Sequence, residues 1–462
     1  MSSRLLLAAC GAAMILAVGM LLSFLPRWHR PLLQLSIITM FFDILSTTIG
    51  GVDARPYQAV TVALLIAFCF RAARKDAPAC NTWVVVAAAL FTLLCWASLL
   101  ISVNHTDTIQ VALGQTYLLA LLACVILAQR TGVLTVGDIS DALIIGATLS
   151  SAAGLLEFVA SYGGVHFQTD QVTGIPWHRA AGLLTEPDWG GLTAAMGLLG
   201  AYLRRPFASD PRIYGNTVVA VNAAELLIAG ARAAWISFIG AVLTIALTRP
   251  GVRGQIRRLL PAIVIVVLGI AAYAASHPSA LSRLSPDAVL GGSGAGDSGS
   301  THSRLGVIRL IEAGVPGALW LGHGAGTLAA VVDYPINQVV YGGGGQLNAG
   351  HGNANIELTL LWDGGIVMLT SFLFLALFWL RCAWRARRHP ELFAISVVML
   401  IDFQFNNGIR FAFVWVVVAA CAMSARQARA RTELVAPTTD PSPLLLSPML
   451  VHNQVRPKPR MM

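Results

Sequence analysis

The sequence has little charge, since only 11% of its 462 residues are Asp, Glu, Lys or Arg, whereas 56% are hydrophobic. An ordinary soluble domain carries roughly 25% charged residues, because its surface must be hydrated. So few charges do not suffice to cover a water-facing surface of this size. The composition therefore excludes a conventional soluble domain and indicates a chain that is mostly embedded in lipid.

The sequence also lacks the patterns of disulfide, metal and nucleotide sites. None of the seven cysteines lies in the long polar segment 276–350, which excludes a disulfide framework there, and no Cys/His spacing matches a zinc site. The glycine-rich stretches 322–326 and 342–345 do not continue into Gly-Lys-Ser/Thr, so they are interpreted as flexible turns. We therefore expect no metal and no cofactor.

What the sequence does have is a series of apolar segments, many of them near the ~20 residues that cross a bilayer. They predict an all-α polytopic membrane protein with about 12 to 13 transmembrane helices. The candidate spans are 5–25, 32–50, 57–70, 83–103, 109–128, 139–160, 190–203, 216–231, 233–248, 259–275, 355–380, 391–405 and 409–424.

The basic residues are distributed unequally between the two sides of these spans. Of the 31 Lys and Arg residues, all but eight fall on one side, which basic loops mark as cytoplasmic. This orientation and the attraction of cytoplasmic loops to anionic lipid explain the net charge of +9 without a nucleic-acid partner. The eight on the outer side are Arg4, Arg55, Arg179, Arg232, Arg283, Arg304, Arg309 and Arg410.

The orientation divides the chain into three regions. Residues 1–160 form N-terminal transmembrane helices, and residues 161–424 form a membrane region with two outward loops, 161–189 and 276–350. Within the second loop, the spacing of 303–320 predicts a short helix at the membrane surface. Residues 425–462 are rich in proline and basic residues, and we expect a disordered cytoplasmic tail.

Three outward arginines are candidates for binding an anion. Arg232 lies at a break between two apolar runs, Arg179 precedes a span, and Arg304 opens the predicted surface helix. A guanidinium binds phosphate oxygens through two hydrogen bonds and stays charged. Each arginine also has a structural interpretation. Arg232 could anchor its helix at the lipid headgroups or pair with Glu225 on the same helix face. Arg179 could form a surface ion pair or an anchor, and Arg304 could be an ordinary solvated residue.

A histidine stands where the long outer loop re-enters the membrane. His351 is suited to taking a proton near neutral pH, although a single histidine is often structural. Asn355 and Glu357 follow and are placed to orient it or to contact sugar hydroxyls, while Glu357 is equally placed to cap the helix. Glu186, close behind Arg179, is a supporting candidate.

These residues occur in an order that resembles the O-antigen ligase and polymerase superfamily. The resemblance is carried by R-x-x-G-x-x-x-E-P at 179–187, G-A-R-A-A-W at 230–235, S-R-L-G-V-I with the later G-H-G-A-G, and the segment from His351 into W-D-G-G. It covers the chain from Arg179 to the last span, whereas the first half matches only as membrane helices. Each motif is weak alone, and their order and outward placement make the combination more specific.

The resemblance implies a metal-independent glycosyltransferase with a helical architecture of the lipid-linked (GT-C-like) type in the bacterial inner membrane. The donor would be a glycan on undecaprenyl diphosphate, and the active site would face the periplasm. Arg232, Arg304 and Arg179 would hold the diphosphate, and His351 would be the catalytic base. The acceptor would be a glycan or lipid A core, and other polysaccharide assembly proteins are expected partners.

Within this superfamily, we favour a polymerase of O-antigen or exopolysaccharide repeat units over an O-antigen ligase. The family usually has Asn, Ser or Gln after the histidine, whereas this chain has Gly352, and its outer loop is rich in glycine. A secondary transporter or lipid flippase is the alternative from another class, with Asp43 and Asp402 as its best support. Transporters often show repeated halves, however, and the polar residues here are concentrated in one outward loop.

Overall fold

The computed structural model of the chain is a bundle of helices. It describes residues 3–49, 52–71, 80–164, 179–184, 186–205, 215–249, 311–312, 314–328, 355–386 and 389–435, together with 254, 264, 267, 268 and 271. The helices are α1 Ser3–Ser23, α2 Pro26–Thr39, α3 Pro56–Cys69, α4 Thr82–Ala97, α5 His105–Arg130, α6 Val136–Tyr162, α7 Pro187–Arg204, α8 Asn216–Ile228, α9 Arg232–Thr248, α16 Ile356–Arg385, α17 Pro390–Asp402 and α18 Ala412–Val435.

Every predicted span from 5 to 248 and from 355 to 424 overlaps one of these helices. The span 32–50 was predicted too long, because α2 ends at Thr39 and is followed by a 3-10 turn at Asp43–Leu45 and by a β-strand. The predicted span 259–275 lies outside the described residues, apart from 264, 267, 268 and 271. Between α2 and α3 the chain also forms a small antiparallel hairpin of β1 Thr47–Ile49 and β2 Val52–Ala54, which the all-α prediction did not include.

Four helical segments are long and apolar enough to cross a bilayer. They are Thr82–Ile101, His105–Arg130, Val136–Tyr162 and Ile356–Arg385. These segments are what an α-helical membrane protein requires, because about 20 apolar residues span the hydrocarbon core. Other apolar helices, such as α3 with 14 residues and α8 with 13, are shorter than that length. The larger number of crossings therefore stays a prediction.

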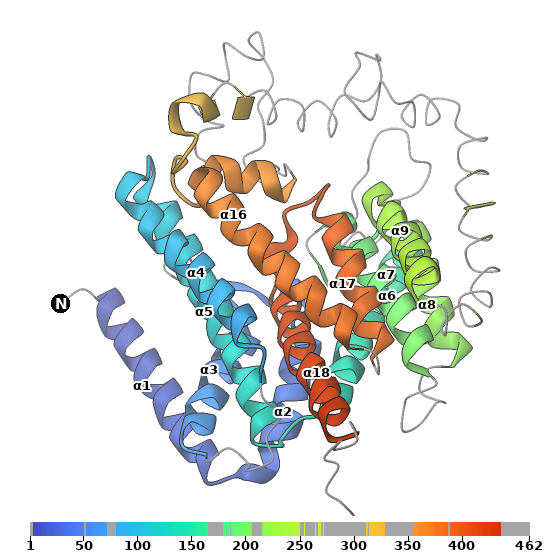
Figure 1. Cartoon of the computed structure of the whole chain (residues 1–462), viewed down its shortest axis with the longest axis horizontal. Coiled ribbons are helices and arrows are strands. Elements are labelled where there is room, and N and C mark those ends of the chain that lie inside the picture. The colour runs from blue at the N-terminus through green and yellow to red at the C-terminus, as the bar shows by residue number, and fades with distance from the viewer. Residues whose placement is uncertain are drawn as a thin grey trace, which may run out of the picture.

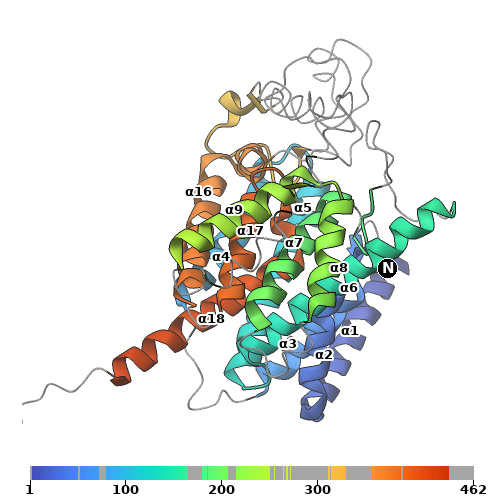
Figure 2. The ribbon, with the colours of Figure 1, turned by 90° about the vertical axis from the view of Figure 1, so that its right-hand side faces the viewer.

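Three helices form the centre of the bundle. Nearly every residue of α7 is buried, as are most of α17 and the part of α18 from Ala412 to Ala425. The outer helices expose apolar side chains instead, for example Leu93 of α4 at 63% and Leu377 of α16 at 59%. Helices α6, α8 and α9 pack against α7, and α9, α16 and α18 pack against α17 (Figures 1 and 2). Apolar side chains on both the inside and the outside are expected where lipid replaces water.

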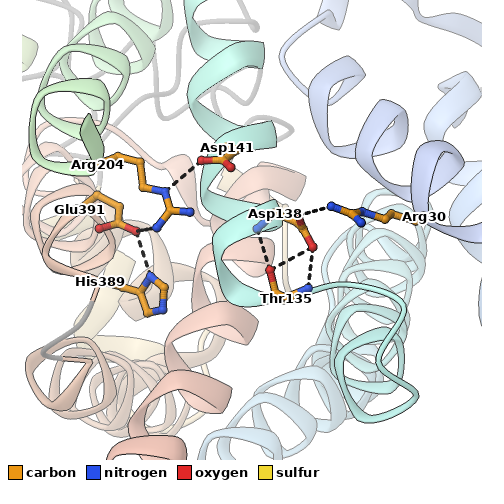
Figure 3. A network of polar contacts seen from close by, with 7 residues as sticks. All are labelled: Arg30, Thr135, Asp138, Asp141, Arg204, His389 and Glu391. Atoms are coloured by element: carbon orange, nitrogen blue, oxygen red, sulfur yellow. Dashed lines mark hydrogen bonds and ion pairs between the residues drawn. The ribbon is translucent and has the colours of Figure 1, made fainter. Parts of the chain in front are cut away.

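The bundle has a basic end, where α2, α6 and α17 begin and α7 and α9 end. Arg30 of α2 pairs with Asp138 of α6 at 2.7 Å, and Arg249 after α9 donates to the carbonyl oxygen of Ala383 at 3.4 Å. Asp138 also forms a capping box with Thr135, which starts α6 (Figure 3). These contacts keep residues of the predicted cytoplasmic side together, and we call the other end of the bundle the opposite end.

A charged network lies buried at the basic end. Arg204 in the last turn of α7 donates to Asp141 of α6 at 2.9 Å and lies 3.7 Å from Glu391 of α17. His389, just before α17, contacts the same glutamate at 3.1 Å (Figure 3). The side chains of Arg204 and Glu391 are 8% and 0% exposed. Their charges therefore depend on each other, because a buried charge is costly without a partner.

Helix α16 is kinked at Gly364 and Gly365, and the turn that follows residue 318 packs against the kink. His323 and Gly324 donate their backbone N–H groups to the carbonyls of Trp362 and Asp363 at 2.8 and 2.9 Å. Ile366 donates to the carbonyl of Leu319 at 2.9 Å. The prediction of turns at 322–326 is confirmed, but the turns are held by backbone hydrogen bonds rather than flexible.

The predicted surface helix 303–320 is described only from residue 311 onward. Residues 311–312 and 314–318 are helical, and the buried side chains of Ile311 and Val315 cluster with Trp362 of α16. Trp320, just beyond, is 68% exposed. At the other end of the chain, α18 continues to Val435, past the boundary of the predicted tail at 425. Its Arg-, Ala- and Gln-rich sequence consists of good helix formers.

Substitution of Gly365 by alanine is expected to destabilise the protein by about 1 to 3 kcal/mol. Gly365 has a φ of 62°, which L-residues rarely adopt, and an added Cβ would lie 2.3 Å from the carbonyl carbon of Trp320. Thermal unfolding of the detergent-solubilised protein measures this loss. Gly114 of α5 is the control, because a Cβ there meets nothing within 4 Å. Equal melting temperatures for Gly365→Ala and Gly114→Ala would show that the kink is not strained.

Candidate functional site

The candidate site lies at the opposite end of the bundle, where the side chains of four of the outward arginines are described. Two of them pair with buried carboxylates. Arg55 lies 3.1 Å from Asp43, and Arg410 lies 3.6 Å from Asp363 at the α16 kink. Asp43 and Asp363 are 4% and 3% exposed, so these arginines balance charges inside the protein. The remaining two, Arg179 and Arg232, meet at one turn.

Arg179 reaches the turn between α8 and α9. Its Nε donates a hydrogen bond of 2.7 Å to the carbonyl oxygen of Ala229, and its guanidinium pairs with Asp188 in the first turn of α7. An ion pair was one of the two structural interpretations of Arg179, and it is present with Asp188 as partner, but the Arg179 side chain is only 12% exposed. Ala229 caps the end of α8 and lies three residues before Arg232 in the sequence, so this hydrogen bond holds Arg179 at the turn that leads to Arg232.

Arg232 is the first residue of α9. Gly230, with a φ of 60°, ends the preceding helix and turns the chain, and Nε1 of Trp235 donates to the carbonyl of Leu226 across the turn at 2.7 Å. The half-buried Arg232 side chain therefore starts at a helix N-terminus, where unpaired N–H groups carry partial positive charge. Two arginines, Arg232 and the Asp188-paired Arg179, therefore lie at this turn.

Two glycines of α7 permit this arrangement. A Cβ at Gly191 would lie 2.7 Å from the Cβ of Ala231, and a Cβ at Gly190 would lie 3.0 Å from the carbonyl oxygen of Ala181. Small residues let helix backbones approach closely in membrane proteins. The start of α7 therefore packs between the segment 179–184 and the α8–α9 turn, and brings both arginines to its own N-terminus.

The expected partnership of Glu225 with Arg232 on one helix face is wrong. Helix α8 ends at Ile228, so Glu225 and Arg232 lie on different helices. Glu225 is 1% exposed, and neither of its carboxylate oxygens has a hydrogen-bond partner among the described residues. Its carboxylate fits against Gly154 of α6, where a Cβ would lie 2.4 Å away.

The supporting residues Glu186, Asn355 and Glu357 lie at helix starts. The backbone carbonyl of Glu186 accepts hydrogen bonds from the first turn of α7. Asn355 caps α16 by accepting from the N–H of Leu358 at 2.9 Å, so the capping role belongs to Asn355. Glu357 instead accepts a hydrogen bond of 2.7 Å from Gln404, in the loop after α17.

The loop 403–411 after α17 also connects these residues to the α8–α9 turn, which we call the arginine turn because Arg179 and Arg232 lie there. Ile356 donates its N–H to the carbonyl of Phe403 at 3.0 Å, and Phe411 packs edge-on against Trp189 of α7 with ring centroids 4.5 Å apart. The structure thus places the starts of α7, α9 and α16 at one end of the bundle (Figure 2). The candidate base His351 and the candidate Arg304 lie outside the described residues, as do 165–178 of the first outward loop.

Sequence reasoning missed three side chains that hold Arg179 and its segment in place. They are Asp188, Glu157 and Ser150, the last two from α6. An acidic residue inside an apolar span, such as Glu157, is a signal that a partner exists, but the partner lies elsewhere in the chain. Within the described residues, no group of three or more His, Cys, Asp or Glu side chains is arranged to hold a metal ion.

The arginine turn has the chemistry of an anion site. Arg179, Arg232 and the N-terminus of α9 lie at this turn, together with Asp188 as the partner of Arg179, and arginines and helix N-termini bind phosphate oxygens. In comparisons with known proteins, no family model matches the chain and no curated protein matches it.

Proposed function

We propose that the chain is a metal-independent glycosyltransferase of the bacterial inner membrane that uses a glycan on undecaprenyl diphosphate. The observation that supports it best is the convergence of Arg179 and Arg232 on the α8–α9 turn, through the 2.7 Å hydrogen bond from Arg179 to Ala229. These two arginines belong to separate segments and to separate superfamily-like motifs. Their charges would stabilise a diphosphate bound at this turn. The GT-C-like architecture is part of this proposal.

The proposed reaction transfers the glycan to a hydroxyl group of the acceptor. The hydroxyl oxygen attacks the anomeric carbon, the bond from that carbon to the diphosphate oxygen breaks, and undecaprenyl diphosphate leaves with the electron pair. His351 takes the proton of the hydroxyl, in the role that the resemblance gives it. Arg179, Arg232 and Arg304 stabilise the charge that grows on the leaving diphosphate.

We propose polymerisation of lipid-linked repeat units as the specific activity, with transfer to lipid A core as the alternative. The preference rests on Gly352 after His351 and on the glycine-rich outer loop. The two residues that best supported a transporter both have polar contacts: Asp43 with Arg55, and Asp402 with Nδ2 of Asn406 at 3.2 Å. Such contacts suit structural roles for both aspartates.

The test is an assay of the purified protein with an undecaprenyl-diphosphate-linked oligosaccharide and no ion gradient. A polymerase lengthens the lipid-linked glycan into a ladder of repeat units, whereas a ligase requires added lipid A core. A deletion strain gives an independent result, because loss of a polymerase leaves single repeat units and loss of a ligase leaves unattached polymer. A purified protein that moves the lipid-linked donor across a vesicle membrane without changing the glycan would contradict both.

A further inference from the structure

The segment 179–184 forms a small backbone site for an anion, and the protein fills it with its own carboxylate. Oε2 of Glu157, in the last part of α6, accepts hydrogen bonds from the N–H groups of Ala181 at 3.2 Å and Gly182 at 3.1 Å. Two successive backbone N–H groups that point to one oxygen are a common way to bind an anion. Glu157 is 4% exposed, so this contact lies inside the protein.

The segment is pressed closely onto α6. Gly182 has a φ of 66°, and a Cβ there would lie 2.5 Å from the backbone oxygen of Ser150. The N–H of the next residue, Leu183, donates to Oγ of Ser150 at 3.4 Å, and its carbonyl accepts from the N–H of Ile44. The backbone of residues 181–183 is therefore held by α6 and by the N–H group of Ile44.

This arrangement determines which groups of the segment reach the proposed diphosphate. The N–H groups of Ala181 and Gly182 are already engaged by Glu157, so the segment contributes its side chain, Arg179, and not its backbone. Arg179 lies only two residues before Ala181, and its Nε bond to Ala229 fixes the direction of the guanidinium. Displacement of residues 181 and 182 would move Arg179 away from Arg232.

We propose that Glu157 is a positioning residue of the diphosphate site, which holds Arg179 beside Arg232 by binding the N–H groups of Ala181 and Gly182. This inference rests on the proposed function, because it assigns Glu157 a role in diphosphate binding. Glu157 does not touch the substrate in this role. Its effect on binding passes through Arg179.

The test combines two measurements on the purified full-length protein. Calorimetry measures the binding of inorganic pyrophosphate, and hydrogen–deuterium exchange measures the protection of the amides of residues 181 and 182. In Glu157→Ala, these amides are expected to exchange faster and pyrophosphate binding to weaken about tenfold. Glu157→Gln should restore both to near the wild-type values, because the glutamine oxygen accepts the same hydrogen bonds.

A double-mutant cycle separates positioning from a general loss of structure. Once Arg179 is replaced by alanine, adding Glu157→Ala should weaken binding no further, because the two residues act through one contact. Asp138→Asn is the matched control, since Asp138 is a carboxylate of the same helix that accepts a backbone N–H, at 2.8 Å, but at the basic end. It should leave pyrophosphate binding unchanged.

Three results would overturn the proposal in distinguishable ways. Faster exchange with wild-type pyrophosphate affinity in Glu157→Ala would make Glu157 a folding residue only. Unchanged exchange would show that Glu157 does not hold the segment. Absence of pyrophosphate binding by the wild-type protein would refute the diphosphate site itself. If Glu157→Ala does not fold, Glu157→Asp serves instead, because its shorter side chain withdraws the oxygen, and it should weaken binding in the same direction.

Discussion

Replacement of Arg232 by alanine is expected to lower the rate of glycan transfer by about two to three orders of magnitude, the usual loss when one charge-stabilising donor is removed from an active site. Arg232 starts α9 at the turn that Arg179 also reaches, and in the proposed mechanism its guanidinium stabilises the charge that grows on the leaving diphosphate. Single-turnover transfer from the lipid-linked donor measures this rate. The transfer rate of Arg232→Lys should lie between those of the wild type and Arg232→Ala, because lysine keeps the charge but not the paired hydrogen bonds.

The control for Arg232 is Arg130→Ala. Arg130 is an exposed arginine at the end of α5, at the basic end of the bundle. Its loss should leave the transfer rate unchanged. A transfer rate for Arg232→Ala within about twofold of the wild-type rate would remove Arg232 from the site, since twofold corresponds to well under 1 kcal/mol of transition-state stabilisation.

Replacement of Arg204 by alanine should give the largest loss of stability, about 3 to 5 kcal/mol, because it removes a cation that pairs with the buried carboxylate of Glu391. Arg204 lies between Asp141 and Glu391, and the side chain of Glu391 is fully buried (Figure 3). Thermal or denaturant unfolding of the detergent-solubilised protein measures the change. Arg204→Ala combined with Glu391→Gln should recover part of the loss, since one of the uncompensated charges is then removed.

Arg30→Ala is the control for Arg204, because Arg30 also pairs with an aspartate of α6 but is 59% exposed. Exposed ion pairs contribute about 0 to 1 kcal/mol, so its effect should be several times smaller. Similar losses for the two variants would mean that burial of the network does not determine its contribution. That result would contradict the structural role assigned to Arg204.

Local sequence was sufficient to place most helices and the break at Arg232. Apolar runs are contiguous in sequence, so the spans could be located without any tertiary information, and Arg232 does begin a helix after a turn at Gly230. The error at Glu225 came from extending one helix through this turn. A positive φ at a single glycine was enough to put Glu225 and Arg232 on different helices.

The contacts of the candidate site could not be predicted in the same way, because each joins segments far apart in sequence. Arg179 bonds to Ala229, and Glu157 bonds to the backbone of Ala181 and Gly182. A carboxylate bound to backbone N–H groups leaves no pattern of residue types at the partner positions. Gly190 and Gly191 were visible in the sequence, but only the packing of α7 shows that their missing side chains make room for the arginine turn.

The sequence by itself determined that this protein is helical, rich in segments suited to a bilayer, and asymmetric in its basic residues, because hydrophobicity and charge are properties of each segment alone. Only the tertiary structure decided which charges have partners. Arg55, Arg204 and Arg410 pair with buried carboxylates, and Arg179, which is paired with Asp188, reaches the turn at which Arg232 starts α9. The physical reason is that the cost of a charge in a membrane protein depends on its neighbours in space, and packing alone selects those neighbours.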